Sequence, residues 1–138
     1  MAESLAPELL PRAGESHWRW RERMALHIAG QMDAVRLGVA AFYLMGSTKN
    51  ATAGPASDID LIVHFRGSEA QRAELLRWLD GWSQILGEIN RHHTGCQTGG
   101  LLDVHIVTDA EIAQKTSYAV RIGAVTDPAR PLKLGKHD

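Results

Sequence analysis

The chain has 138 residues, a length that fits a single domain with its own hydrophobic core. Its 15 lysines and arginines against 16 acidic residues give a net charge of −1, which excludes a general electrostatic attraction to nucleic acid. The single cysteine, Cys96, excludes an internal disulfide, and no apolar run reaches the length of a membrane span, so a cytoplasmic protein with no membrane or disulfide partner is expected.

Residues 1–15 hold two prolines and a glycine and are expected to form a flexible arm, followed by one domain over residues 16–138. Ser16 is expected to cap a helix that runs to about Arg36. Apolar residues recur in it at steps of three and four: Trp20, Met24, Ile28, Met32 and Val35. The interleaved arginines, Arg19, Arg21 and Arg23, are expected to be solvated rather than to form an RNA-stacking surface with the tryptophans.

Two predicted strands, 39–45 and 58–65, are separated by a short polar loop. The second strand begins Asp58-Ile59-Asp60, although aspartate is depleted in strands. Alternate strand residues share a face, so the two carboxylates project to the same side with backbones roughly 6.6 Å apart. Two oxygen ligands held in this way suit Mg²⁺, which keeps other positions for water and substrate phosphate.

The first strand ends in Gly46-Ser47, which suits a phosphate cradle. Glycine allows close approach of the backbone, serine offers a hydroxyl and an N–H group, and a short helix over about 47–51 would direct its positive end at the anion. Lys49 adds a positive charge two residues later. A serine hydrolase is disfavoured, because Ser47 is not in a Gly-x-Ser-x-Gly sequence.

The second half of the chain predicts a helix over about 69–89, a polar loop over 90–100, a strand over 101–107, a helix over about 109–122 and a short edge strand near 131–133. The loop contains His92, His93 and Cys96, but their spacing matches no closed zinc site. The strand contains Asp103, again an unexpected acid in an apolar segment. His105 and His64 share faces with strand acids and are expected to be structural rather than proton acceptors.

The pattern apolar-Gly46-Ser47, ten residues, Asp58-x-Asp60 with apolar flanks resembles the signature of the DNA polymerase beta-like nucleotidyltransferase superfamily, particularly its small single-domain members. The resemblance covers about residues 39–107. It implies an α/β fold of the α+β type, a small mixed β-sheet with helices mainly on one face. It also implies a third carboxylate on a neighbouring strand, a place that only Asp103 fits.

The implied reaction is metal-dependent transfer of a nucleoside monophosphate from a nucleoside triphosphate, ATP first, to an acceptor hydroxyl. Asp58, Asp60 and Asp103 are then the catalytic and metal-binding residues for two Mg²⁺ or Mn²⁺ ions. Gly46, Ser47 and Lys49 are the expected phosphate-binding residues. The alternatives are a catalytically silent nucleotide-binding or partner-binding regulatory module of the antitoxin type, and a metal-dependent phosphohydrolase.

Larger members of the resembled superfamily append a helical domain that holds the acceptor, whereas only 35 residues follow Asp103 in this sequence. The acceptor site is therefore expected from a helical protein partner, from a fused domain, or from the open edge of this domain. A protein, a nucleic acid and a small molecule all stay open as the acceptor.

Overall fold

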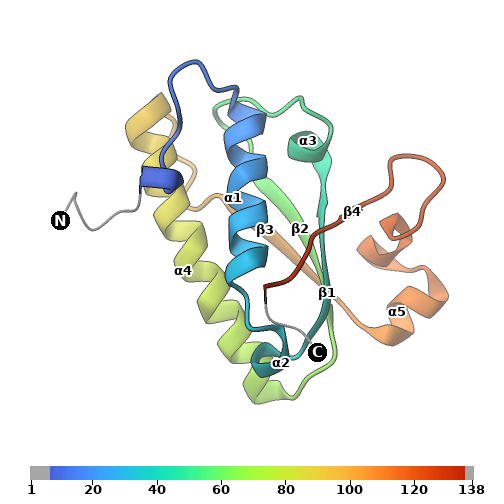
Figure 1. The fold of residues 1–138 in the computed structure, drawn as a ribbon. Coiled ribbons are helices and arrows are strands. Elements are labelled where there is room, and N and C mark those ends of the chain that lie inside the picture. Colours follow the sequence, from blue (N-terminus) through green and yellow to red (C-terminus); the bar gives the residue numbers. More distant parts are fainter. Residues whose placement is uncertain (1–6, 136–138) are drawn as a thin grey trace.

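A mixed β-sheet lies at the centre of the computed structural model, which describes residues 7–135 (Figure 1). Its strands are β1 (Val39–Met45), β2 (Ile59–Phe65), β3 (Leu102–Val107) and β4 (Arg130–Pro131), in the order β3-β2-β1-β4. β1 is antiparallel to both β2 and β4, whereas β2 and β3 are parallel. Parallel neighbours need a long crossover, which the helix α4 (Glu69–Thr94) supplies.

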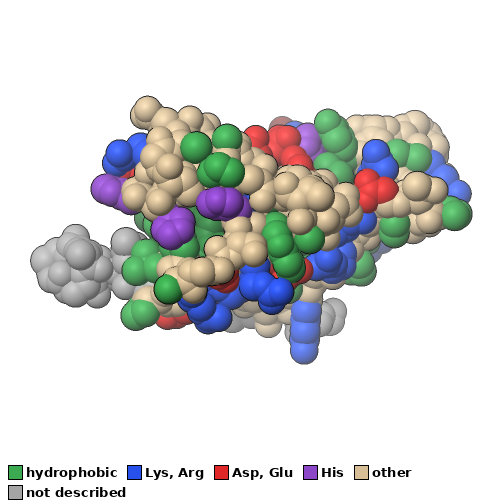
Figure 2. All heavy atoms as spheres, turned by 90° about the horizontal axis from the view of Figure 1, so that it is seen from above, with side chains coloured by type: hydrophobic (Ala, Val, Ile, Leu, Met, Phe, Trp, Pro, Cys, Tyr) green, Lys and Arg blue, Asp and Glu red, His purple; other side chains and the backbone are tan. Residues whose placement is uncertain are grey.

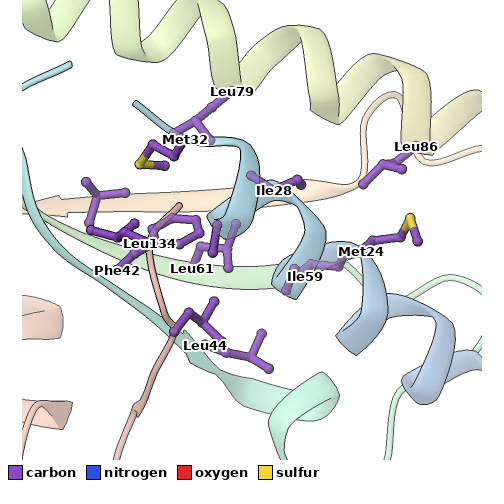
Figure 3. Close-up of a cluster of buried hydrophobic side chains, with 14 of the residues drawn as sticks. Met24, Ile28, Met32, Phe42, Leu44, Ile59, Leu61, Leu79, Leu86 and Leu134 are labelled. Carbon is purple, nitrogen blue, oxygen red and sulfur yellow. The ribbon is translucent and has the colours of Figure 1, made fainter. Parts of the chain in front are cut away.

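One face of the sheet carries the main core, beneath α4 and the helix α1 (His17–Gln31). Figure 3 shows side chains from α1, α4, β1 and β2 converging in one cluster. The fully buried members include Met24 and Ile28 of α1, Phe42 of β1, and Leu61 of β2. The expected fold class, a small mixed sheet with helices mainly on one face, is confirmed.

The opposite face is only partly covered. A smaller apolar cluster there includes Met45, Ile62 and Val107, packed beside α5 (Asp109–Gln114) and the 3-10 helix η3 (Ser117–Arg121). Because strand side chains alternate, the burial of Ile59 and Leu61 in the main core turns Asp60 to this second face.

The predicted helix over residues 16–36 is wrong in its last five residues. It ends at Gln31, and a separate turn, α2 (Ala34–Leu37), follows. The Asp33 side chain accepts a hydrogen bond from the N–H of Arg36 and so begins α2, which Gly38 ends with a left-handed backbone, φ 73°. Val35, predicted in the buried stripe, is 60% exposed.

Two later helices also differ from the prediction. α4 begins at Glu69 behind a capping box of Ser68 and Gln71, but it continues to Thr94, five residues into the predicted loop. The predicted helix over 109–122 is interrupted at Lys115, whose φ is 56°, and is divided into α5 and η3. No residue of α5 is fully buried. The helix therefore lacks the packing of an apolar face that would stabilise a longer one.

The described part of the predicted arm packs on α1. The 3-10 turn η2 (Pro7–Leu9) buries Leu9, whose carbonyl accepts a hydrogen bond of 3.0 Å from the Trp20 indole. Residues 1–6 of the predicted arm and 136–138 of the predicted domain lie outside the described residues. Within residues 7–135, no helix combines the length and apolar character needed to cross a bilayer.

Candidate active site

The site begins with the register of two parallel strands. In the β2–β3 pair, Asp60 lies opposite Asp103 and Ile62 lies opposite His105. Neighbouring strands are about 4.8 Å apart, so the two acids occupy adjacent places on the partly covered face of the sheet. The sequence contains both acids, but their pairing depends on strands that α4 separates.

Ligand atoms of Asp60, Asp103 and His105 all lie within 4.8 Å of one another. His105 Nε2 is 3.3 Å from Asp103 Oδ2, and its ring stacks on Tyr118 with centroids 3.6 Å apart. Figure 2, which views this end of the molecule from above, shows acidic side chains gathered beside a histidine. In the described part of the chain, this is the one group of three or more metal-binding side chains placed so closely.

Burial and mutual repulsion both disfavour the ionised form of these acids. The pKa of Asp60 is raised from 3.8 to about 6, chiefly by burial, and further by a hydrogen bond to Asp103 and by the charges of Asp103 and Asp58. Burial and the charge of Asp103 also raise the pKa of Asp58, against the attraction of Arg21. Carboxylates that destabilise one another without a cation form a suitable binding site for one.

Asp58 lies at the edge of this group. It is exposed and directly precedes β2. Its charge contributes to the raised pKa of Asp60, and the charge of Asp103 contributes to its own raised pKa, but it is not within the 4.8 Å cluster. The structure therefore brings together two of the three predicted acids, places the third beside them, and adds His105. In the sequence, the spacing Asp103-x-His105 within a strand already predicts that the two side chains share a face.

The Gly46-Ser47 corner lies against the same acids. Met45 pairs with Asp60 across β1 and β2, and Gly46 opens the short helix α3 (Gly46–Lys49). A Cβ atom on Gly46 would lie 2.2 Å from Asp60 Oδ2, and its φ of 73° independently favours glycine. The Ser47 carbonyl accepts hydrogen bonds from the N–H groups of Thr52 and Ala53, which folds the following loop back on the corner.

Lys49 has other partners in the structure. Its ammonium group donates hydrogen bonds of 2.7 Å to Asp127 Oδ1 and to the Pro128 carbonyl, and the side chain is only 11% exposed. A phosphate contact by Lys49 remains a prediction, and it requires this ion pair to open.

The remaining histidines lie outside the acidic group. His64 pairs with Asp109 beyond the other end of β3, and His92 and His93 are exposed near the end of α4. Neither His92, His93 nor Cys96 belongs to the close group found within residues 7–135.

One prediction for α1 is wrong. Arg21, expected to be solvated, is completely buried and donates to the carbonyl groups of Ser57 and Pro55 just before Asp58. The sequence pattern that could have predicted this burial is the four-residue spacing of Arg21, Ala25 and Ala29. The two alanines extend the buried face of α1 beyond its large apolar residues, and Arg21 lies on the same line.

The fold and this geometry define a class of protein. Paired acids on neighbouring strands, beside a Gly-Ser corner, form a candidate site for a divalent cation and a phosphate group, which suits a phosphoryl- or nucleotidyl-transfer domain.

Comparison with protein families then matches residues 28–95 to the nucleotidyltransferase domain. Over this segment the chain carries a nucleotidyltransferase domain, which is consistent with a small nucleotidyltransferase of the polymerase beta-like class. The matched segment contains Gly46, Ser47, Asp58 and Asp60 and ends before Asp103. Comparisons with curated proteins and with solved structures gave no match.

Proposed function

We propose that this nucleotidyltransferase transfers a nucleoside monophosphate from a nucleoside triphosphate, ATP first, to an acceptor hydroxyl in the cytoplasm. The observation that carries the proposal is the register pair Asp60–Asp103 beside Gly46, in a chain with a nucleotidyltransferase domain. Gly46 can lie this close to the Asp60 carboxylate only because it lacks a Cβ atom.

The donor set fits Mg²⁺ or Mn²⁺. Asp58, Asp60 and Asp103 offer carboxylate oxygens, which these hard cations prefer. The pKa of Asp60 is raised chiefly by burial and further by Asp103 and Asp58, and a bound cation would stabilise the ionised carboxylate. His105 is better suited to support Asp103, since ligating carboxylates are themselves commonly held by hydrogen bonds. Two bound ions would neutralise the triphosphate and lower the pKa of the acceptor hydroxyl.

The transfer step makes one bond and breaks another, and residues of the chain bind the triphosphate and accept the proton. The acceptor oxygen forms a bond to the α-phosphorus, the bond from that phosphorus to the β-phosphate bridge oxygen breaks, and pyrophosphate leaves. Asp103 receives the acceptor's proton, a role that the 49% exposure of its side chain supports. Gly46 and Ser47 bind the β- and γ-phosphates and align the triphosphate, and Lys49 joins them after leaving Asp127.

We place the acceptor on a second molecule or a fused domain. The acids lie on the partly covered face of the sheet, next to the edge strand β3, so a partner can reach Asp103 directly. A helical protein partner is the first candidate, and a nucleic acid or a small molecule would need the same access.

The test is incubation with Mg²⁺ or Mn²⁺ and triphosphates labelled at the α or the γ position, with cell lysate as the source of acceptors. We expect α-label on an acceptor and free labelled pyrophosphate from the γ-label. An Asp58→Ala variant should lose transfer by on the order of 10²-fold or more, because a metal ligand is removed.

Other results identify the alternatives. Labelled orthophosphate without acceptor labelling would indicate a phosphohydrolase. Metal-dependent triphosphate binding without any product would indicate the silent regulatory module.

A further inference from the structure

A buried arginine with neutral partners links the core to the site loop. Arg21 of α1 is 0% exposed, and its Nε donates to the Ser57 carbonyl at 2.9 Å. One terminal nitrogen, Nη2, donates to the Pro55 carbonyl at 3.2 Å and to Asn90 Oδ1 at 2.9 Å, and Nη1 donates to the His17 carbonyl at 3.3 Å. Asn90, itself 1% exposed on α4, donates to the same Pro55 carbonyl at 2.9 Å.

Stability alone does not account for this arrangement. Among the described residues Arg21 has no carboxylate partner within ion-pair distance, and its burial lowers the pKa of the guanidinium group. A buried charge is costly unless it is paired, and replacing buried charged groups by apolar side chains of similar volume is often neutral or stabilising. What an arginine provides at this position, and an apolar side chain would not, is hydrogen bonds to the Pro55 and Ser57 carbonyls of the loop.

Those bonds hold the backbone next to Asp58. The loop segment from Gly54 to Ser57 has two hydrogen bonds of its own. The Ser57 N–H donates to the Gly54 carbonyl, and the Gly54 N–H donates to Ser57 Oγ. The carbonyl that Arg21 Nε binds belongs to the peptide unit whose nitrogen is that of Asp58. A peptide unit is planar, so fixing this carbonyl also fixes the plane from which the Asp58 backbone continues.

We propose that Arg21, together with Asn90, is a positioning residue that fixes the peptide unit before Asp58 and so directs its carboxylate to the cation site. The proposal rests on the proposed function, because it assigns Asp58 to that site. Among charged groups, Asp58 attracts Arg21 most strongly, and Arg21 in turn lowers the pKa of Asp58. The two side chains are therefore coupled electrostatically as well as through the backbone. Partners that orient metal ligands typically contribute 10- to 100-fold in metal affinity.

Mn²⁺ binding to the full chain without nucleotide, measured by calorimetry and by the electron paramagnetic resonance of free Mn²⁺, tests this role. We expect Arg21→Met to weaken Mn²⁺ binding by about 10-fold or more. Arg21→Lys should recover part of the affinity, since it keeps the charge but not the forked set of donors. Asn90→Leu, which keeps Arg21, should weaken binding by a smaller factor.

Arg23→Met is the matched control on the same helix. Arg23 bonds the Glu15 side chain and the carbonyls of Glu8 and Leu10, all in the N-terminal segment. Its loss should lower the melting temperature and leave Mn²⁺ affinity unchanged, which separates general destabilisation from positioning.

The outcomes are distinguishable. Wild-type protein that binds no Mn²⁺, or an Asp58→Ala variant that binds it fully, would contradict the proposed metal site and this proposal with it. Binding that depends on Asp58 but is unchanged in folded Arg21→Met would overturn the positioning role alone. If Arg21→Met does not fold, Asn90→Leu decides: weaker Mn²⁺ binding supports the proposal, and unchanged binding overturns it.

Discussion

Asp60 makes the folded protein sensitive to pH when no cation is bound. Its pKa rises from 3.8 to about 6 on folding, so the native state retains the proton over this range while the unfolded chain releases it. The native state therefore gains stability from protonated Asp60 at low pH, fully so below about pH 4, and loses this contribution as the pH rises through 6. In EDTA at about pH 7.5, we expect Asp60→Asn to raise the free energy of unfolding by on the order of 1 kcal/mol, a value reduced for the partial exposure of the group.

Urea unfolding of both proteins between about pH 4 and pH 8 measures this effect. The gain should shrink to a small fraction at the acidic end, where Asp60 is protonated in the native state and close to half protonated in the unfolded chain. Asp109→Asn is the control, because the pKa of Asp109 is lowered by its hydrogen bonds to Arg66 and His64, and its loss should give no gain at neutral pH. A constant gain from Asp60→Asn at every pH would contradict the electrostatic cause.

Gly46 is the residue at which added volume should damage the site most directly. An alanine Cβ there would lie 2.2 Å from Asp60 Oδ2, on a backbone with φ 73°. We expect Gly46→Ala to cost about 1–3 kcal/mol of stability and to weaken Mn²⁺ binding, because Asp60 must move. Chemical denaturation and calorimetry measure the two effects.

Gly81→Ala provides the contrast. Gly81 lies within α4 with open space at the Cβ position, so alanine should stabilise the protein by about 0.5–1 kcal/mol and leave cation binding unchanged. If both substitutions had the same small effect, the close contact between Gly46 and Asp60 would not exist in solution.

At the scale of elements, the segment before α1 is attached by an ion pair that titrates in acid. Arg23 lowers the pKa of Glu15 from 4.5 to about 2, chiefly through a hydrogen bond, and the Glu15 side chain is only 4% exposed. A lowered carboxyl pKa stabilises the fold above the unfolded value, and this contribution is lost as the pH falls from about 4.5 toward 2.

Glu15→Gln should therefore cost on the order of 1–2 kcal/mol at neutral pH and nearly nothing at pH 2. Denaturation curves at a series of pH values give the difference directly. A cost that persists unchanged in acid would mean that packing, and not the ion pair, attaches the segment.

The elements that sequence predicts best are those whose signals are local. β1 has the predicted bounds, 39–45, because an apolar run lies between two glycines. The break at Asp33 was missed, since the apolar spacing continues across it and only a cap interrupts the helix. Lys115 was missed for a related reason: a non-glycine residue with positive φ gives no composition signal.

At the scale of the whole molecule, contacts between distant segments were the least predictable part of the candidate site. The alternation that places Asp58 and Asp60 on one side is local, but the pairing of Asp60 with Asp103 depends on the register of two strands joined by α4. Arg21 reaches Ser57, 36 positions away, and Lys49 reaches Asp127, 78 positions away. Such partners are set by packing, which sequence spacing does not reveal.

A nucleotide that binds the site should stabilise the whole fold. Mg²⁺ or Mn²⁺ with triphosphate is expected to add about 2.7 kcal/mol at a hundredfold excess over the dissociation constant, because the ligand binds only the native state. Thermal unfolding with metal, with triphosphate and with both measures this linkage. Equal melting temperatures under all three conditions at millimolar concentrations would argue strongly against nucleotide binding.

The most direct test asks whether the chemistry resides at the acids joined across β2 and β3. Transfer from α-labelled triphosphate to a lysate acceptor should be compared in wild type, Asp60→Asn, Asp103→Asn and the exposed control Asp109→Asn, which lies beyond the far end of β3. We predict that both site variants stay folded and lose label transfer by on the order of 10²-fold or more, while the control keeps it. Undiminished transfer by a folded Asp60→Asn protein would contradict the account.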